Sequence, residues 1–488
     1  MTRQFKQGLT AAAGLAAAFA LAIAAAVPVH ATGRTAPPDD VAHARAMLAA
    51  ARGASPVLCT LAEQAVAYRN GWGWRRGPTA QPATAAVAHW ALSDRPSDGA
   101  VRILLAGLAE PDACVASIAA RLLAHAESPA ATAGMLHALA ADAAGTRFAA
   151  ATGLGFADAH GAVHALIARL SDDVANVRGA AAWALGSIGD PLAAAPLRRT
   201  LSDRSAAVRA AAAEALGTIE DTAAVDALAR ALQSDTSEDV RVAAAEALGH
   251  IEAKRAVSAL SGALGDRSAR VRKTAAWALG QIEDTSAVAG LTRAVQDSDR
   301  DVRRMAVWAL GQIEAKSAVA PLATVLGHDN DIETRRMAAW ALGQIEDKSA
   351  VTPLANALHD QDADVRKTSA WALGQIEDKS ATTPLSAALG DSDADVRQTA
   401  AWALGQIEDP AAVPALSKAL HDTDAKVRRT ALWALGQLDT DAATSAIVDA
   451  LKDADPQVRA EAARALGHGH IDPRPRPKPR PRPRPFPD

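Results

Sequence analysis

Aromatic residues are scarce in this chain of 488 residues. They make up 3% of the sequence, with tyrosine present once and phenylalanine five times. Alanine, leucine and valine dominate instead. Because large aromatic side chains favour strands while alanine and leucine favour helices, the composition predicts an all-α fold.

Cysteine is also rare, since the chain contains only Cys59 and Cys114. In an exported protein such a pair favours one disulfide that fixes the N-terminal region. Two buried thiols are the alternative interpretation, and the sequence does not decide between them.

The chain carries no excess of positive charge. The formal net charge is −4, to which the N-terminal segment contributes Arg3 and Lys6 and the C-terminal tail contributes six basic against two acidic residues. The part of the chain between these ends therefore carries a charge near −10. A nucleic-acid partner is not expected, because binding DNA or RNA requires a basic face.

Long apolar runs are absent except at the N-terminus. Residues 9–29 form an alanine-rich apolar run that follows Arg3 and Lys6 and ends at a small-residue cleavage site, Val29-His30-Ala31. This arrangement predicts a cleaved signal peptide over residues 1–31. The mature protein would then be secreted or periplasmic, without stable membrane insertion. An uncleaved N-terminal anchor is the alternative, because the run approaches spanning length.

What the chain does contain is a repeat. The sequence VRKTAAWALGQIED from Val271 returns with small changes from Val302, Val365 and Val396. One glycine marks the same position every 31 or 32 residues. The series is Gly155, Gly186, Gly217, Gly249, Gly280, Gly311, Gly343, Gly374, Gly405, Gly436 and Gly467. Strict periodicity of this length predicts a solenoid over residues 131–470, in which each unit buries its apolar face against its neighbours.

Each unit is predicted to contain two helices, here named helix A and helix B. In residues 284–314, Asp284 and Ser286 are candidate N-caps of helix A, and helix B is expected from about Asp301 to Glu314. The glycine then falls inside helix B, where it is unfavourable by ~1 kcal/mol relative to alanine. We expect close approach of a neighbouring helix to compensate.

An aspartate precedes the arginine of each Val-Arg or Thr-Arg step by six residues, as in Asp297 and Arg303. An aspartate in the turn and an arginine one turn into helix B can bond within a unit and to the next unit. We interpret this pair as a structural ladder and not as chemistry. Arg147 lacks such an aspartate, which indicates where the regular units begin.

The two ends of the chain differ from the repeats. Residues 32–130 are expected to form an N-terminal helical cap of degenerate repeats, because a solenoid end must cover its apolar face. Residues 471–488 alternate proline with arginine or lysine, which predicts an extended polyproline-like tail. We expect this tail to meet acidic surfaces, anionic envelope polymers or the acidic body itself. Folding back onto the row of tryptophans, on which proline stacks well, is a minor alternative that the arginines on both sides oppose.

The pattern Asp…Val-Arg…Ala-Leu-Gly-x-Ile, preceded by an Ala-Val-x-Pro-Leu helix, resembles HEAT repeats. It is most similar to the short form found in phycobilin lyases and deoxyhypusine hydroxylase. This resemblance implies a right-handed superhelix in which helix B lines the concave side, usually a surface that binds protein. It covers roughly residues 130–470 and is weak for function.

The resemblance also raises an enzymatic alternative. Deoxyhypusine hydroxylase holds two irons with His-Glu pairs on helix B, but no His-Glu dipeptide occurs in this chain. His328, His359 and His421 recur at the ends of helix A, where the helix dipole favours a histidine without any ligand. We therefore expect no metal, no cofactor and no catalytic residues.

A polar and aromatic stripe is the candidate binding site. Projection of one helix B at ~100° per residue places Trp308 nearly opposite the apolar residues, with Arg304 and Gln312 four residues to either side. The stripe comprises Lys273, Trp277, Gln281, Arg304, Trp308, Gln312, Arg336, Trp340, Gln344, Lys367, Trp371, Gln375, Gln398, Trp402, Gln406, Arg429, Trp433 and Gln437. An exposed row of indoles flanked by polar groups is typical of an interaction surface.

The stripe has two interpretations at this stage. It can bind a protein or extended peptide on the concave face, or its side chains can stack on each other and stabilise the solenoid. We predict a non-enzymatic protein-binding scaffold, with an enzyme of the hydroxylase or lyase type and a purely mechanical spacer as the alternatives. The sequence gives neither the partner nor the oligomeric state.

Overall fold

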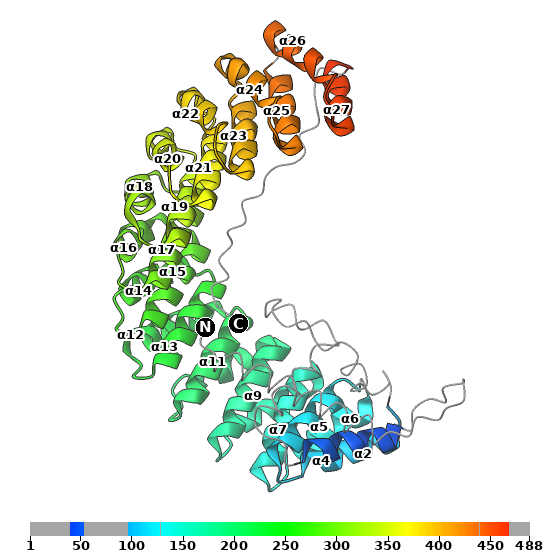
Figure 1. Cartoon of the computed structure of the whole chain (residues 1–488). Coiled ribbons are helices and arrows are strands. Elements are labelled where there is room, and N and C mark those ends of the chain that lie inside the picture. The colour runs from blue at the N-terminus through cyan, green and yellow to red at the C-terminus, as the bar shows by residue number, and fades with distance from the viewer. Residues whose placement is uncertain (1–39, 53–95, 127, 439, 468–488) are drawn as a thin grey trace, which may run out of the picture. The chain divides into compact units, whose positions relative to one another are not determined.

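The computed structural model describes residues 40–52, 96–126, 128–438 and 440–467. Every regular element within these ranges is a helix (Figure 1). The prediction of an all-α solenoid of stacked two-helix repeats is confirmed. By its internal contacts the chain divides into two units, which meet between Ile251 and Glu252 and are described separately below.

The first unit begins with helices that belong to the predicted cap and continues with two-helix repeats. The segment from Asp40, expected to be helical, forms α2. Its helices are α2 (Asp40–Ala51), α4 (Asp98–Leu108), α5 (Ala113–Ala124), α6 (Pro129–Ala138), α7 (Ala144–Phe156), α8 (Val163–Arg169), α9 (Ala175–Ile188), α10 (Ala194–Thr200), α11 (Ala206–Thr218), α12 (Val225–Ser234) and α13 (Glu238–His250). From α7 onward the odd-numbered helices are the B helices, and in this unit α7 packs on α9, α9 on α11 and α11 on α13.

The second unit repeats the same pattern with greater regularity. Its helices are α14 (Val257–Ala263), α15 (Ala269–Ile282), α16 (Val288–Ala294), α17 (Arg300–Ile313), α18 (Val319–His328), α19 (Ile332–Ile345), α20 (Val351–Ala357), α21 (Ala363–Ile376), α22 (Thr382–Ala388), α23 (Ala394–Ile407), α24 (Val413–Ala419), α25 (Ala425–Gln437), α26 (Asp441–Ala450) and α27 (Pro456–Gly467). Each odd-numbered helix from α17 to α27 packs against its predecessor in this row.

Local capping sets the start of both helices in a repeat. The Asp284 carboxylate accepts a hydrogen bond from the backbone N–H of Ser286 and starts a 3₁₀ turn, Thr285–Ala287, that leads into α16. The Asp299 carboxylate accepts from the N–H groups of Asp301 and Val302 at the start of α17. Capping aspartates satisfy backbone donors that have no partner inside the helix. The predicted helix B agrees with α17 to within one residue.

Helix B ends at an unusual residue. In most repeats a glutamate follows the last helical residue in the left-handed backbone conformation, where glycine is the common choice. These glutamates have φ between 51° and 57°: Glu220, Glu252, Glu283, Glu314, Glu346, Glu377 and Glu408. Gly189 takes this place in one repeat, with φ of 69°. A non-glycine residue is unfavourable there by about 1 kcal/mol, so each glutamate turn carries local strain.

The core lies between helices A and B of each repeat and between consecutive repeats. In α17, Val302, Ala306, Ala309 and Leu310 are fully buried and Ile313 nearly so. Most of these side chains are small. Small side chains allow two helices to approach closely, which makes the packing sensitive to added volume.

A ladder of arginine–aspartate pairs joins consecutive repeats. Arg303 donates through Nη1 to the carbonyl of Asp297 in its own repeat and through Nε to the carboxylate of Asp329 in the next repeat, at 2.7 Å. The same ion pair, between an arginine and the aspartate carboxylate of the next repeat, occurs in Arg147–Asp172, Arg178–Asp203, Arg209–Asp235, Arg272–Asp297, Arg335–Asp360, Arg366–Asp391, Arg397–Asp422 and Arg428–Asp453. The predicted structural ladder is therefore present in both units.

The ladder also explains the missing aspartate before Arg147. The guanidinium needs only a backbone carbonyl from its own turn, and the carbonyl of Ala141 provides it at 3.0 Å. The carboxylate comes from the next repeat, where Asp172 accepts from Nε and Nη2 at 2.8 Å. An aspartate therefore serves the arginine of the preceding repeat, and the arginine that begins the series requires none in its own turn.

Consecutive B helices approach most closely at the repeat glycine. A methyl group placed on Gly343 would lie 2.8 Å from Cζ3 of Trp371 and 2.9 Å from both Cα and Cβ of Ala372 in the next helix B. Gly374 and Gly405 have the same two kinds of neighbour one repeat later. The close approach expected from the sequence is confirmed, and it offsets the poor helix propensity of glycine.

Acid should weaken the ladder. The hydrogen bond from Arg147 lowers the pKa of Asp172 to about 2, and arginine partners likewise lower the pKa of Asp203, Asp235 and Asp422. A carboxyl with a depressed pKa stabilises the fold above its unfolded pKa of ~3.9 and loses that contribution as the pH falls towards 2. We expect Asp172→Asn to lower stability by about 2 kcal/mol at pH 7 and by much less near pH 2. Thermal unfolding across this pH range measures the difference, with Asp142→Asn as the control. A difference in stability between Asp172→Asn and the parent protein that stays constant with pH would contradict the role of this carboxylate in the ladder.

Two glycine substitutions should change stability in opposite directions. Gly343→Ala forces backbone atoms of α21 apart, so we expect a loss of about 1–3 kcal/mol, the usual range for overpacking. Gly327→Ala lies on α18 with no atom within 4 Å of the added methyl group. We expect it to raise stability by about 0.5–1 kcal/mol through helix propensity alone. Urea denaturation of both variants provides the comparison, and equal effects would refute the packing role of Gly343.

Candidate functional site

The predicted stripe lies entirely in the second unit, on six successive B helices: α15, α17, α19, α21, α23 and α25 (Figure 1). Each helix contributes one tryptophan at the same position, a basic residue or Gln398 four residues earlier, and a glutamine four residues later. The structure therefore places equivalent side chains at equivalent points of consecutive repeats, as the sequence predicts.

The tryptophans, however, are not exposed. Their exposed fractions lie between 4% and 9%. The prediction of an outward-facing row of indoles is wrong for Trp277, Trp308, Trp340, Trp371, Trp402 and Trp433. The physical reason is that the B helices pack side by side, so the side of each helix that faces away from helix A is covered by its neighbours in the row.

Five of the six indoles, from Trp308 to Trp433, pack over the glycine of the preceding repeat. Cζ3 of Trp308 lies 2.6 Å from the point where a Cβ on Gly280 would be, and Cζ3 of Trp340 lies 2.8 Å from the corresponding point on Gly311. The indole Nε1 atoms of Trp308 and Trp433 are buried and have no acceptor among the described residues. Packing and not hydrogen bonding therefore holds these rings, and the stabilising interpretation of the tryptophans accounts for their position.

The basic residues of the stripe are half-buried and partly neutralised. Three of them pair with an acid one helical turn earlier: Arg304 with Asp301, Arg336 with Glu333, and Lys367 with Asp364. The last pair measures 2.5 Å from Nζ to Oδ1, and this hydrogen bond lowers the pKa of Asp364. Arg429 donates to the side chain of Gln457 on α27. These contacts reduce the positive charge that the stripe presents.

The glutamines are the unsatisfied groups of the stripe. All of them are half-buried, and within the described residues none of their side-chain amides has a hydrogen bond: Gln281, Gln312, Gln344, Gln375, Gln406 and Gln437. Each amide offers two N–H donors and one carbonyl acceptor. The accessible chemistry of the stripe is therefore a row of free amide groups, one per repeat, supported from below by buried indoles.

The first unit carries different side chains at the equivalent positions. Trp183 on α9 is half-buried and makes an edge-to-face contact with Phe156 on α7, with ring centroids 4.8 Å apart. The guanidinium carbon of Arg121 on α5 lies 4.3 Å above the Phe156 ring. The sequence did not predict this cluster, although Phe156 occupies the position that glutamine takes in the second unit. Such a cation–aromatic stack packs consecutive B helices and presents no row of amides.

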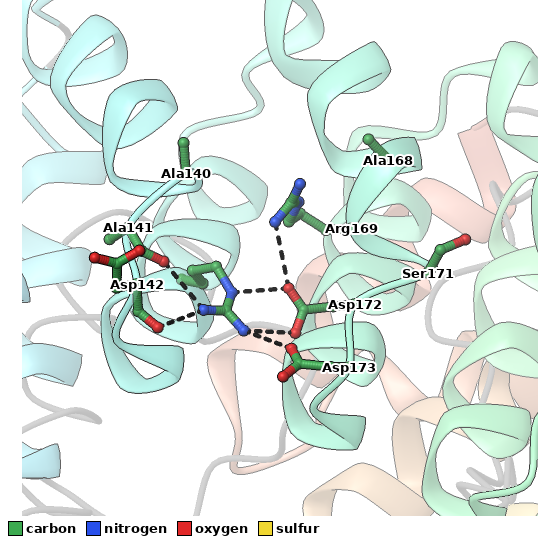
Figure 2. A pocket seen from close by; sticks show the side chains of 9 residues that line it. Ala140, Ala141, Asp142, Ala168, Arg169, Ser171, Asp172 and Asp173 are labelled. Atoms are coloured by element: carbon green, nitrogen blue, oxygen red, sulfur yellow. Dashed lines mark hydrogen bonds and ion pairs between the residues drawn. The ribbon is translucent and has the colours of Figure 1, made fainter.

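A polar hollow in the first unit is part of the ladder. Arg147 on α7 donates to the carboxylates of Asp172 and Asp173 and to the carbonyls of Ala141 and Asp142 in the preceding turn. Figure 2 labels these four partners around the hollow. Arg169 also donates to Asp172 at 3.4 Å. Because the arginine and aspartate satisfy each other, this hollow is a structural rung and not a binding site.

Other sequence-predicted groups fall in several places. His328, His359 and His421 are exposed at or just after the ends of the A helices. In the described ranges, no group of three or more His, Cys, Asp or Glu side chains is arranged to hold a metal ion.

Cys114 is buried in the first turn of α5 and is disulfide-bonded, while Cys59 lies outside the described residues. The predicted signal peptide and basic tail also lie outside them. None of the described helices combines the length and hydropathy needed to cross a membrane.

Two solved structures are similar to parts of this chain. Human deoxyhypusine hydroxylase in complex with glycerol is 26% identical over 52% of this chain and 98% of its own, with a TM-score of 0.25. A structure of Kap95p bound to RanGDP is 16% identical, covering 88% of this chain and 60% of that chain, with a TM-score of 0.49. Both scores are below 0.5, so neither likeness bears on function. No curated protein matches the sequence.

The family comparison covers most of the repeats. The family model of HEAT repeats matches residues 163–248, 230–306, 291–363, 351–425 and 415–476. These matches coincide with the stacked helix pairs from α8 to α27. The chain belongs to the HEAT repeat family.

Proposed function

We propose that this protein is a non-enzymatic scaffold that binds an extended polypeptide along the glutamine row of the second unit. One observation carries the proposal: the amides of Gln281 to Gln437 recur once per repeat, half-buried and without a hydrogen bond in the described structure. Each of these accessible amides offers two N–H donors and one carbonyl acceptor to a ligand. A row of them left open is suited to the free backbone carbonyls and N–H groups of an extended partner.

The surrounding residues support such a site. The buried tryptophans fix the B helices side by side, so the amides are held at intervals of ~8–10 Å, the usual distance between packed helices. The half-buried basic residues contribute aliphatic stems as well as charge. Specificity would then come from backbone recognition along several repeats, with modest side-chain selection at Arg304, Arg336, Lys367 and Arg429.

We place this surface on the concave side of the second unit. There, each B helix contacts the next along the row, whereas neighbouring A helices touch one another far less. A row of more closely packed helices lies on the inner side of a bend. A concave surface would surround an extended partner on more than one side and bury more of it per repeat.

Binding should depend on the glutamines and not on the accessible A helices. We expect Gln312→Ala, Gln344→Ala, Gln375→Ala and Gln406→Ala, combined in one variant, to weaken binding of peptides selected from a random library on the full chain. With a net value near 1 kcal/mol per hydrogen bond, the loss should reach roughly 100-fold or more. Fluorescence anisotropy of the selected peptides gives the affinities.

A matched variant controls for nonspecific effects. Thr324→Ala, Asn356→Ala and Thr383→Ala change exposed polar residues on α18, α20 and α22 in the same repeats, and we expect them to leave affinity unchanged. Replacing the tryptophans is a poor test, because alanine at a buried tryptophan removes about 3–5 kcal/mol of stability. If the glutamine variant binds as tightly as the parent, the site assignment fails.

We also propose export of the mature chain to the periplasm or beyond, on the basis of the N-terminal sequence. Cleavage after Ala31 would make Thr32 the first residue of the mature protein. N-terminal sequencing of the protein from envelope and culture fractions tests this. A chain that retains Met1 in those fractions would instead indicate the uncleaved anchor.

A further inference from the structure

The glutamine row has a feature that bears on its occupant. Each glutamine from Gln281 to Gln406 lies near the C-terminal end of its helix B, and two residues later comes the exposed glutamate of the left-handed turn. Gln344 and Glu346, Gln375 and Glu377, and Gln406 and Glu408 repeat this arrangement. The turn glutamates have no ion pair or side-chain hydrogen bond in the described residues. A row of free amides is thus accompanied by a row of unpaired carboxylates.

The structure also removes an objection to a basic occupant. Lysine and arginine in the stripe would repel arginines in a ligand, but Arg304, Arg336 and Lys367 are already paired with acids on their own helices. Arg429 on α25 donates to the neutral side chain of Gln457 and keeps its charge, so the objection is removed for α17, α19 and α21 and not for α25. Gln398 replaces the basic residue in the following repeat and leaves Asp395 exposed, with no side-chain partner in the described residues. Towards α23 the row is therefore acidic.

The chain itself contains a segment of complementary chemistry. From residue 473 to 487 every odd position is proline, and the even positions carry Arg474, Arg476, Lys478, Arg480, Arg482 and Arg484. Proline has no N–H, so this segment has more backbone acceptors than donors. Its free carbonyls match the amide donors of the glutamines, and its cations match the turn glutamates.

The dimensions of this segment agree with those of the row. A polyproline II helix advances ~3.1 Å per residue with three residues per turn, so one turn covers ~9.3 Å. This distance falls within the ~8–10 Å between packed helices, so backbone carbonyls of successive turns can meet successive repeats in the same way. Because proline and basic residues alternate along the segment, the side chain that faces the row is basic on one turn and proline on the next. On the proline turns, the basic residue next along the chain is the one that would reach the glutamate. The fifteen residues from 473 to 487 would extend about 45 Å and cover four to five repeats.

The position of the tail agrees as well. α27 packs on α25 as the last helix of the B row, and the residue of its repeat that corresponds to the glutamines is position 468. The chain therefore leaves α27 level with the glutamine row, and a direct return along α25, α23, α21 and α19 needs no long connection.

We propose that residues 471–488 of this chain dock in an extended conformation along the glutamine row of α25 to α19, with the basic side chains against Glu408, Glu377 and Glu346. This inference rests on the proposed function, because it assigns an internal ligand to the same surface. The tail would act as an intramolecular competitor that external peptides must displace. A basic, proline-rich segment in trans would then be the kind of partner that this surface accepts.

The experiment places a photo-crosslinking residue at the end of the tail in the full-length protein. With Phe486→p-benzoylphenylalanine, irradiation in low salt should give crosslinks within one chain to peptides of α19, α21, α23 or α25, identified by mass spectrometry. Replacing the six basic residues with serine should lower the crosslink yield about tenfold, because the tail then loses its charge attraction to the row. Unchanged thermal unfolding would confirm that the tail variant retains its fold.

Each other outcome overturns the proposal. Crosslinks only to A helices or to the first unit, or none, would show that the tail does not occupy the row. Crosslinks only between chains, with a yield that rises with protein concentration, would assign the row to a second copy. Library peptides provide an independent readout: they should bind the serine-tail variant several-fold more tightly than the parent, since the competitor is weakened.

The two proposals can fail separately. If crosslinks map to the row but no library peptide binds through the glutamines, the tail proposal stands and the scaffold proposal fails. If peptides bind through the glutamines while the tail crosslinks elsewhere, the reverse holds.

Discussion

The contact between consecutive B helices at the repeat glycine is the constraint on which the rest of the solenoid depends. Gly343, with Trp371 and Ala372 of the following repeat, shows the arrangement: two backbones approach because one residue has no side chain, and an indole closes the remaining space. Dispersion across such a contact is strong only when the fit is tight. The small side chains of the core, the burial of the tryptophans and the regular spacing of the row all follow from this fit.

The arginine–aspartate ladder fixes the same repeats at the opposite end of helix B. A bidentate guanidinium–carboxylate pair has strict geometry, so it sets orientation where alanine-rich packing alone leaves freedom. Arg366 bonds both the carbonyl of Asp360 and the carboxylate of Asp391 and so joins its own turn to the next. Packing at the glycine and hydrogen bonding at the turn together define the distance at which the glutamine amides repeat.

Most of the fold could be predicted from the sequence, because the signals are local or periodic. Helix bounds, the ladder and the close approach at Gly311 all follow from spacing along one chain segment. The burial of Trp340 could not be predicted in this way, because a projection of one helix does not include the neighbouring helices. The contact of this ring with Gly311 depends on how two repeats pack. The glutamate turn at Glu346 was also missed, since that position usually favours glycine. Of the predicted stripe, the glutamines remain as accessible groups while the indoles do not.

The interface between repeats has a direction. The indole of each later repeat fits the glycine of the earlier one, and the carboxylate of each later repeat meets the earlier arginine. Every regular repeat of the second unit therefore carries both sides of the same inter-repeat interface. Insertion or deletion of a whole unit of 31 or 32 residues would recreate this interface between new neighbours, whereas a change of a few residues would separate ring from glycine. The solenoid can consequently change its length in evolution by whole repeats. The length of the proposed binding surface would change with it.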